Sequence, residues 1–112
     1  MRHIRKVDTN QKEIVRALRR VGCTVVDLSD VGRGVPDLLV SRAYRMWLLE
    51  VKAEKGTITP EQHAWNQRWS GPPPVIVRTV DEALAAVGLE IALANQSQNT
   101  LTKGVPNARD EQ

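Results

Sequence analysis

The sequence predicts an α/β domain with a small mixed β-sheet flanked by helices. Three short runs rich in apolar and β-branched residues follow one another within residues 23–53, and a fourth run follows a helical segment. Short links between successive strands favour antiparallel pairing, whereas a helix between the third and fourth strands favours a parallel crossover. A chain of 112 residues is large enough for one hydrophobic core but not for two.

The first predicted element is an amphipathic helix over residues 8–22. Apolar side chains recur at helical spacing in "DTNQKEIVRALRRVG", and Gly22 stands where the helix should end. One of the three residues at 8–10, Asp-Thr-Asn, is expected to cap its start.

Three strands are predicted next, at 23–28, 37–41 and 46–53. The segment 29–36 between the first two contains two glycines and a proline, which are typical of a loop. With "RAYR" at 42–45 as the hairpin connection, antiparallel pairing places Ser41 opposite Met46 and Leu39 opposite Leu48. The same register places Asp37 opposite Glu50.

The second half predicts a helix at 59–71, a strand at 75–78 and a helix at 79–88. Thr59 can cap the first of these helices, and Gln62 completes a capping box. Its tryptophans, Trp65 and Trp69, are expected in the core, and a dimer surface is the alternative use of this side of the helix. We expect one domain over 1–94, because residues 95–112 are polar, lack apolar periodicity and read as a disordered tail.

Composition excludes several classes of protein. A single cysteine, Cys23, and two histidines cannot supply a structural zinc site. No apolar run approaches the length of a membrane helix, and the N-terminus lacks the apolar stretch of a signal peptide, so we expect a cytoplasmic protein without a membrane partner. The net charge of +3 permits a nucleic acid as partner without requiring one.

The third predicted strand carries an unusual pair of charges. Side chains alternate along a strand, so Glu50 and Lys52 share one face of an otherwise apolar segment. Burying two charges costs several kcal/mol unless they pair or bind something. Asp37 is expected beside Glu50, and a divalent cation of the Mg²⁺ or Mn²⁺ type would relieve the repulsion between the two carboxylates. Lys52 could then orient an attacking water or offset charge on a phosphate.

Each of these residues also has a simpler interpretation. The dipeptide Pro36-Asp37 is common in turns, and Glu50 with Lys52 could be a solvent-facing pair on a half-exposed strand. Gln62 could be only a capping residue. The functional interpretation depends on the four side chains acting together.

The pattern Pro36-Asp37, twelve residues, then Glu50-Val51-Lys52 resembles the signature of the PD-(D/E)XK nuclease superfamily. The predicted order of elements matches the restriction-endonuclease-like αβββαβ core of that superfamily. The segments "EIVRALRRVGCTVVDLSDVGRGVPDLLV" and "ITPEQHAWNQRW" look like its VRR-NUC branch, the virus-type replication-repair nuclease domains, in their stand-alone phage-like form. The resemblance covers roughly residues 10–88.

The resemblance implies roles for particular residues. Metal ligands would be Asp37, Glu50 and the backbone carbonyl of Val51, with Glu13 as an additional acid that reaches the metal directly or through water. Lys52 would be the catalytic lysine, and Gln62 would lie near the active site, where the capping role competes for the same side chain. The catalytic set is therefore Asp37, Glu50, Lys52, Glu13 and Gln62.

The resemblance also implies a function. The protein would be a Mg²⁺-dependent DNA endonuclease, with Mn²⁺ as an alternative metal, that acts on four-way junctions or flaps in replication, recombination or repair. A homodimer is expected, since a two-fold dimer offers two sites for two strands. Basic residues would contact the DNA backbone, and the candidates are Arg33, Lys55, Arg16 and Arg20.

Other functions stay open at this point. A nucleic-acid-binding subunit that has the nuclease fold without useful catalysis would carry similar residues. A restriction-type endonuclease or an RNA-directed nuclease would share the same core motif, because substrate choice depends on loops and quaternary geometry. An adaptor domain with exposed carboxylates would show no metal affinity at this position.

Overall fold

The computed structural model describes residues 6–89 and confirms the predicted α/β class and order of elements. None of the helices in this part of the chain is long and apolar enough to cross a membrane. The predicted tail at 95–112 lies outside the described residues. The elements are α1 (Lys6–Arg20), β1 (Thr24–Asp27), β2 (Leu38–Arg42), β3 (Arg45–Val51), α2 (Pro60–Arg68), β4 (Val75–Val77) and α3 (Val80–Ala86).

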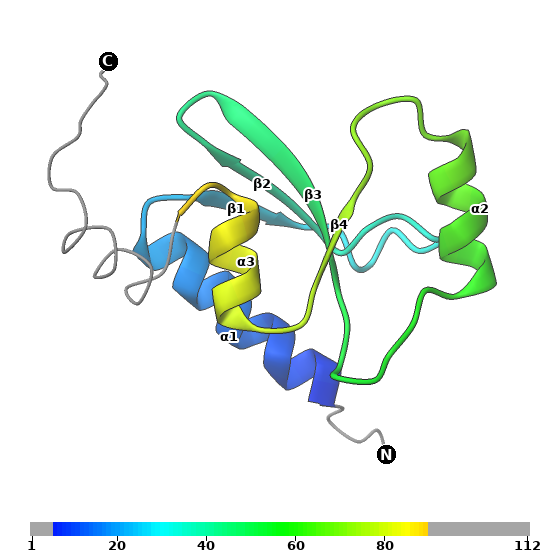
Figure 1. Ribbon diagram of the computed structural model, residues 1–112, viewed down its shortest axis with the longest axis horizontal. Helices are drawn as coiled ribbons and strands as arrows, with labels where there is room; N and C mark the ends of the chain where they lie inside the picture. The colour runs from blue at the N-terminus through cyan, green and yellow to red at the C-terminus, as the bar shows by residue number, and fades with distance from the viewer. Residues whose placement is uncertain (1–5, 90–112) are drawn as a thin grey trace, which may run out of the picture.

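The four strands form one mixed sheet in the order β1-β2-β3-β4 (Figure 1). β1 and β3 each pair antiparallel with β2, and β4 pairs parallel with β3. The predicted hairpin register is confirmed, because Ser41 lies opposite Met46 and Leu39 opposite Leu48. Asp37 directly precedes the first residue of β2 and therefore lies at the end of β3 that carries Glu50.

The β2–β3 connection is tighter than predicted. Arg42 pairs with Arg45, so the turn consists of Ala43 and Tyr44 alone. Both turn residues adopt positive φ angles, 52° and 67°. Two-residue hairpin turns of this kind favour Asn-Gly, because other side chains are strained in the left-handed region.

The hydrophobic core lies between one face of the sheet and two helices, α1 and α3, which also pack against each other. Strand alternation directs every second side chain toward this core. Its buried members are Ile14, Leu18, Cys23, Val25, Leu38, Val40, Leu49, Val51, Val77, Ala83 and Val87.

The opposite face of the sheet is open over much of its area. Its side chains include Val26, Met46 and Ile76, which are all exposed. Leu48 on the same face is half-buried. Glu50 follows two residues later along β3, so alternation places its carboxylate on this face rather than in the core.

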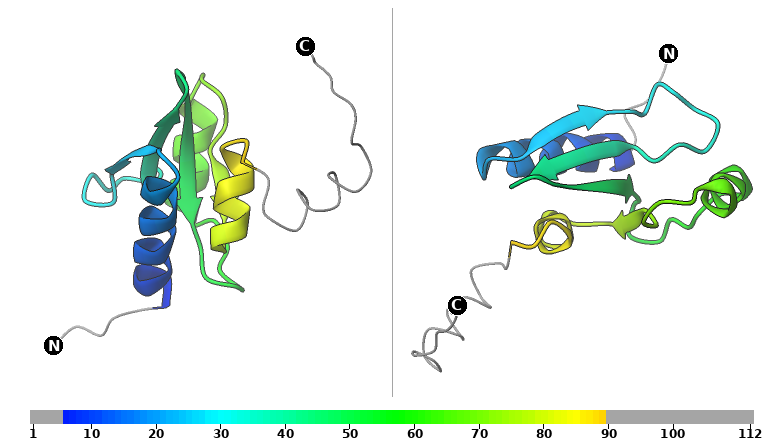
Figure 2. Two further views of the ribbon diagram at one scale, coloured as in Figure 1. Left: turned by 90° about the vertical axis from the view of Figure 1, so that its left-hand side faces the viewer. Right: turned by 90° about the horizontal axis from the view of Figure 1, so that it is seen from above.

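Helix α2 stands apart from α1 and α3 at one end of the molecule (Figures 1 and 2). It contributes no buried residue. The expectation that Trp65 and Trp69 would enter the core was wrong. Instead the two rings stack on each other with centroids 4.9 Å apart, and Trp69 stays exposed.

The two ends of α1 differ in how well the sequence predicted them. Gly22 ends the helix as expected, with a φ of 96° and its amide donating to the carbonyl of Arg19. The helix begins at Lys6, so the expected cap at 8–10 was wrong. Asn10 lies inside the helix, where its side chain donates to the carbonyl of Arg78 at 2.8 Å.

Candidate active site

Asp37 is held against β3 by contacts on both sides of its backbone. Pro36, directly before it, is fully buried, and the amide of Leu28 donates to the Asp37 carbonyl at 2.7 Å. The Asp37 carboxylate in turn accepts a hydrogen bond from the amide of Val51 at 2.8 Å. These contacts fix the carboxylate beside the end of β3 where Glu50 and Lys52 lie.

Glu50 and Lys52 are both largely removed from solvent. Their side chains are 7% and 12% exposed, and the ammonium Nζ lies 3.7 Å from Glu50 Oε2. The amide of Lys52 donates to the carbonyl of Val77, which continues the parallel pairing of β3 with β4. The strand pairing therefore places both side chains where little water reaches them, so that their charged forms require polar partners within the protein.

Gln62 in the first turn of α2 supplies those partners. Its Nε2 donates to Glu50 Oε2 at 2.6 Å, and its Oε1 accepts from Lys52 Nζ at 2.7 Å. The same Oε1 accepts from the amide of Thr59 at 2.9 Å, while Thr59 Oγ1 accepts from the amide of Gln62. The predicted capping box is confirmed, and one side chain serves both the helix cap and the cluster.

The electrostatics of the cluster are dominated by Glu50. Burial, followed by the neighbouring Asp37 carboxylate, raises the pKa of Glu50 to about 8, and Lys52 and Gln62 offset only part of this increase. A carboxyl group with this pKa holds its proton near neutral pH in the absence of a bound cation. Burial of the Glu50 carboxylate, followed by its closeness to Asp37, is therefore the main unfavourable feature of the site.

This donor set fits a hard divalent cation. Carboxylate oxygens are the ligands that Mg²⁺ and Mn²⁺ prefer, and a cation between Asp37 and Glu50 would remove their mutual repulsion. Within residues 6–89, no group of three or more His, Cys, Asp or Glu side chains is arranged around a common metal position. Backbone oxygen, water or substrate would thus have to supply the remaining ligands of a cation bound by the two carboxylates. The carbonyl of Val51 stays a prediction in that role.

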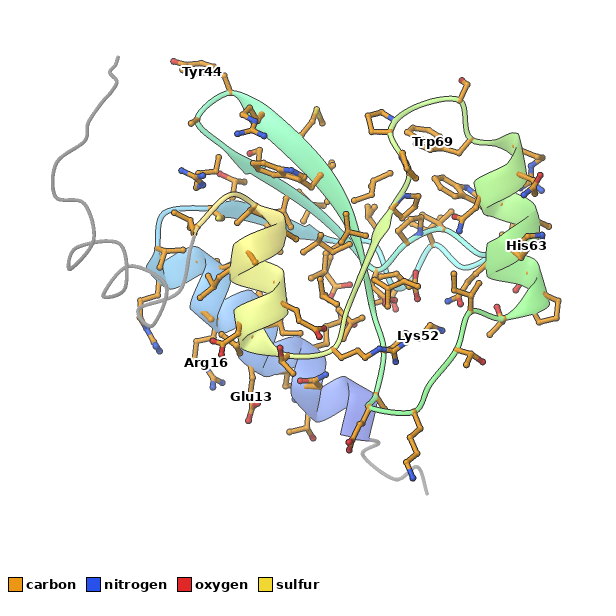
Figure 3. The ribbon with its side chains drawn as sticks, in the orientation of Figure 1. Glu13, Arg16, Tyr44, Lys52, His63 and Trp69 are labelled. Atoms are coloured by element: carbon orange, nitrogen blue, oxygen red, sulfur yellow. The ribbon has the colours of Figure 1, made fainter. Side chains whose placement is uncertain are left out.

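Glu13 lies elsewhere, on the exposed side of α1. It lines a hollow of about 630 Å³ together with Glu54, Arg78 and Glu82. Figure 3 shows Glu13 directed away from Lys52. The structure does not bring Glu13 together with Asp37 and Glu50.

The four predicted DNA-contacting residues, Arg33, Lys55, Arg16 and Arg20, are all exposed. Arg33 belongs to the loop that approaches α2, and the φ angles at Gly32, Arg33 and Gly34 are all positive. A Cβ on Gly34 would overlap the backbone of Glu61, so this glycine permits close approach to α2. Arg16 lies on the same side of α1 as Glu13 (Figure 3).

Two residues that shape the surroundings of Lys52 were not predicted. The guanidinium of Arg78 donates to the carbonyls of Ala53 and Gly56 at 2.7 Å and holds the loop after β3. Asn10 joins α1 to the end of β4 and makes a longer contact, 3.4 Å, with the carbonyl of Lys52. No sequence pattern could have identified them, because one asparagine in a helix and one arginine after a strand are common.

No protein-family model matches the chain, and no curated protein matches it. The fold and the cluster define an α/β domain with two carboxylates, a lysine and a glutamine gathered at the end of a β-hairpin.

Proposed function

We propose that the protein is a Mg²⁺-dependent DNA endonuclease of the PD-(D/E)XK type, similar to the VRR-NUC branch, that hydrolyses phosphodiester bonds in branched DNA. Mn²⁺ is the alternative metal. The observation that carries the proposal is the convergence of Asp37, Glu50, Lys52 and Gln62 from the hairpin and α2. A solvent-facing ion pair between Glu50 and Lys52 would need neither the burial of these side chains nor the Gln62 amide that bridges them.

The donor set suggests how the residues would share the chemistry. A bound divalent cation would supply Lewis-acid activation of a phosphate oxygen and a water molecule. Asp37 and Glu50 would hold that cation, with the Val51 carbonyl as a further ligand. Lys52 Nζ would orient the attacking water and offset the negative charge that develops on the phosphate. Gln62 would keep the ammonium and the Glu50 carboxylate in place.

The remaining parts of the proposal concern DNA and assembly. Arg33, near the first turn of α2, and Lys55, in the loop after β3, lie in segments that flank the cluster and would contact phosphates without reading sequence. Arg16 and Arg20, which are exposed on α1, would contact DNA outside the cluster. The proposed assembly is a homodimer, and sedimentation equilibrium should give twice the 12.5 kDa mass of one chain.

The test is cleavage of labelled DNA. The wild type should be incubated with four-way junction, flap, plain duplex and single-stranded DNA, with magnesium and with chelator, beside Asp37→Ala and Lys52→Ala. We expect magnesium-dependent cutting that favours the branched substrates and is lost in both variants. Binding of branched DNA without cutting in magnesium or manganese would contradict the proposal and favour a non-catalytic binding subunit.

A further inference from the structure

We propose that the capping box of α2 also positions the charged groups of the site, and that Thr59 is a positioning residue acting through Gln62. The consequence for activity rests on the proposed nuclease function, whereas the positioning itself does not. Thr59 is exposed, and neither of its two hydrogen bonds to Gln62 involves a charged group. Its influence would therefore reach Lys52 and Glu50 through Gln62, whose backbone amide and side-chain oxygen both contact Thr59.

The Gln62 amide has one orientation that suits all its neighbours. Its oxygen faces two donors, Lys52 Nζ and the Thr59 amide, and its nitrogen faces the acceptor Glu50 Oε2. Turning the amide over would place its NH₂ group against both donors and its oxygen against a carboxylate oxygen. The Thr59 amide belongs to the backbone, so it is a fixed partner, whereas the other two partners, Lys52 Nζ and Glu50 Oε2, move with their side chains.

The position of Gln62 depends on the first turn of α2 rather than on the core. α2 contributes no buried side chain and stands apart from the other helices (Figure 1). Its first turn is fixed by the Thr59 cap and by the close approach of Gly34 to Glu61. Loosening the cap should therefore loosen the bridge to Lys52 while the hydrophobic core stays intact.

A graded series at position 59 can separate these contacts. Thr59→Ser keeps the hydroxyl and the amide donor, and Thr59→Ala keeps only the amide. Thr59→Pro removes both, and the φ of −77° and ψ of 162° at this position suit proline. The control is Thr79→Ala, because Thr79 Oγ1 accepts from the amide of Glu82 in an equivalent cap on α3 outside the cluster.

The first measurement needs no catalysis. The order parameter of the Gln62 side-chain Nε2 is measured by ¹⁵N NMR relaxation in the metal-free full-length chain. We expect wild type and Thr59→Ser to be rigid, Thr59→Ala to be more mobile and Thr59→Pro to be most mobile, with Thr79→Ala like the wild type. An equally rigid Gln62 amide in Thr59→Pro, or equal loosening in Thr79→Ala, would overturn the proposal.

The second measurement uses cleavage of branched DNA in magnesium. Thr59→Ala should lower kcat by about tenfold with little change in KM, because a small displacement of a catalytic group is costly. Thr59→Ser should restore kcat, and Thr79→Ala should lose a similar amount of thermal stability without losing kcat. Equal kcat in Thr59→Ala and Thr79→Ala would overturn the effect on activity. If the wild type does not cut DNA, the proposed function fails, while the NMR result still decides whether Thr59 positions Gln62.

Discussion

At the scale of single residues, the charged groups of the site are hydrogen-bonded, but two of them are carboxylates that lie close together. Gln62 gives the Glu50 carboxylate a donor and the Lys52 ammonium an acceptor, so neither is left without a polar partner. Burial and, after it, the neighbouring Asp37 carboxylate oppose the ionisation of Glu50 and raise its pKa. A folded protein tolerates such opposition at functional sites, where a ligand can relieve it.

Glu50 should make the stability of the metal-free protein depend on pH. Its pKa rises from 4.5 to about 8 on folding, so the folded state holds a proton that the unfolded chain releases over this range. Stability from this group is present below pH 4.5 and is lost as the pH rises toward 8, by at most about 1.4 kcal/mol per pH unit. Glu50→Gln should flatten this dependence.

The measurement is urea unfolding between pH 5 and 9 in the presence of chelator. Glu54→Gln, at an exposed position, is the matched control and should follow the wild type. Parallel curves for wild type and Glu50→Gln would contradict the assignment of the buried proton to Glu50.

Three of the site residues could be predicted because their signals are local. Alternation along β3 places Glu50 and Lys52 together, and the hairpin register brings Asp37 beside them. Asn10 could not be predicted, since its partners, the carbonyls of Lys52 and Arg78, come from distant parts of the chain. Backbone carbonyls carry no sequence signal.

At the scale of elements, the 29–36 loop contacts α2 in the turn that carries Gln62. Gly34→Ala should destabilise the fold because its φ is +82° and a Cβ would overlap the carbonyl of Glu61. Gly32→Ala is the matched control, with a φ of +76° and open space around it. We expect a loss of about 1 kcal/mol for Gly32→Ala and roughly 2 kcal/mol more for Gly34→Ala.

Chemical denaturation of the two variants gives both losses under the same conditions. Equal losses of stability in Gly32→Ala and Gly34→Ala would show that a Cβ at position 34 is tolerated, and that the close approach of the loop to α2 does not require glycine there. A greater mobility of the Gln62 side chain in Gly34→Ala alone would agree with the first turn as the support of the site.

Elements with strong local signals were predicted well, and the others were not. The capping box of Thr59 and Gln62 has a defined spacing, and it forms as expected. The turn at Ala43 and Tyr44 carries no glycine or asparagine, so its two left-handed residues had no sequence signature. The start of α1 was misplaced because "DTN" resembles a cap although the helix begins at Lys6.

At the scale of the whole molecule, Asn10 adds polar contacts between α1 and the ends of β3 and β4 to the apolar contacts of the core. Asn10 lies in α1, and its side chain donates to the carbonyl of Arg78 directly after β4. The carbonyl of Lys52, directly after β3, lies close to the same nitrogen. Asn10→Ala should lower stability by about 1–2 kcal/mol, because partly buried acceptors lose their donor. It should also loosen the loop after Lys52.

Gln11→Ala is the matched control, since Gln11 is the next residue of α1 and makes an exposed hydrogen bond to Asp27. Its expected loss is within about 0.5 kcal/mol. Alanine favours the helix in both variants, so the difference in free energy of unfolding isolates the hydrogen bonds of Asn10. No difference between the variants would contradict the connecting role.

The order of elements and the sheet topology could be predicted because strand lengths and links constrain them strongly. The separate position of α2 could not, because its tryptophans read as core residues. In the structure Trp65 and Trp69 stack on each other instead. The open face of the sheet could not be predicted either. Alternation tells which residues share a face, but not whether another element covers that face.

The proposed cation site consists of Asp37 and Glu50 beside Lys52. Magnesium and manganese binding by metal-free protein, followed by calorimetry, tests it most directly, with Asp81→Asn as a control at an exposed acid of α3. We predict that the wild type and Asp81→Asn bind one or both metals, and that Asp37→Asn and Glu50→Gln each weaken binding by more than about 10-fold. Absence of binding by the wild type, or unchanged affinity in Asp37→Asn, would show that these carboxylates do not form a cation site.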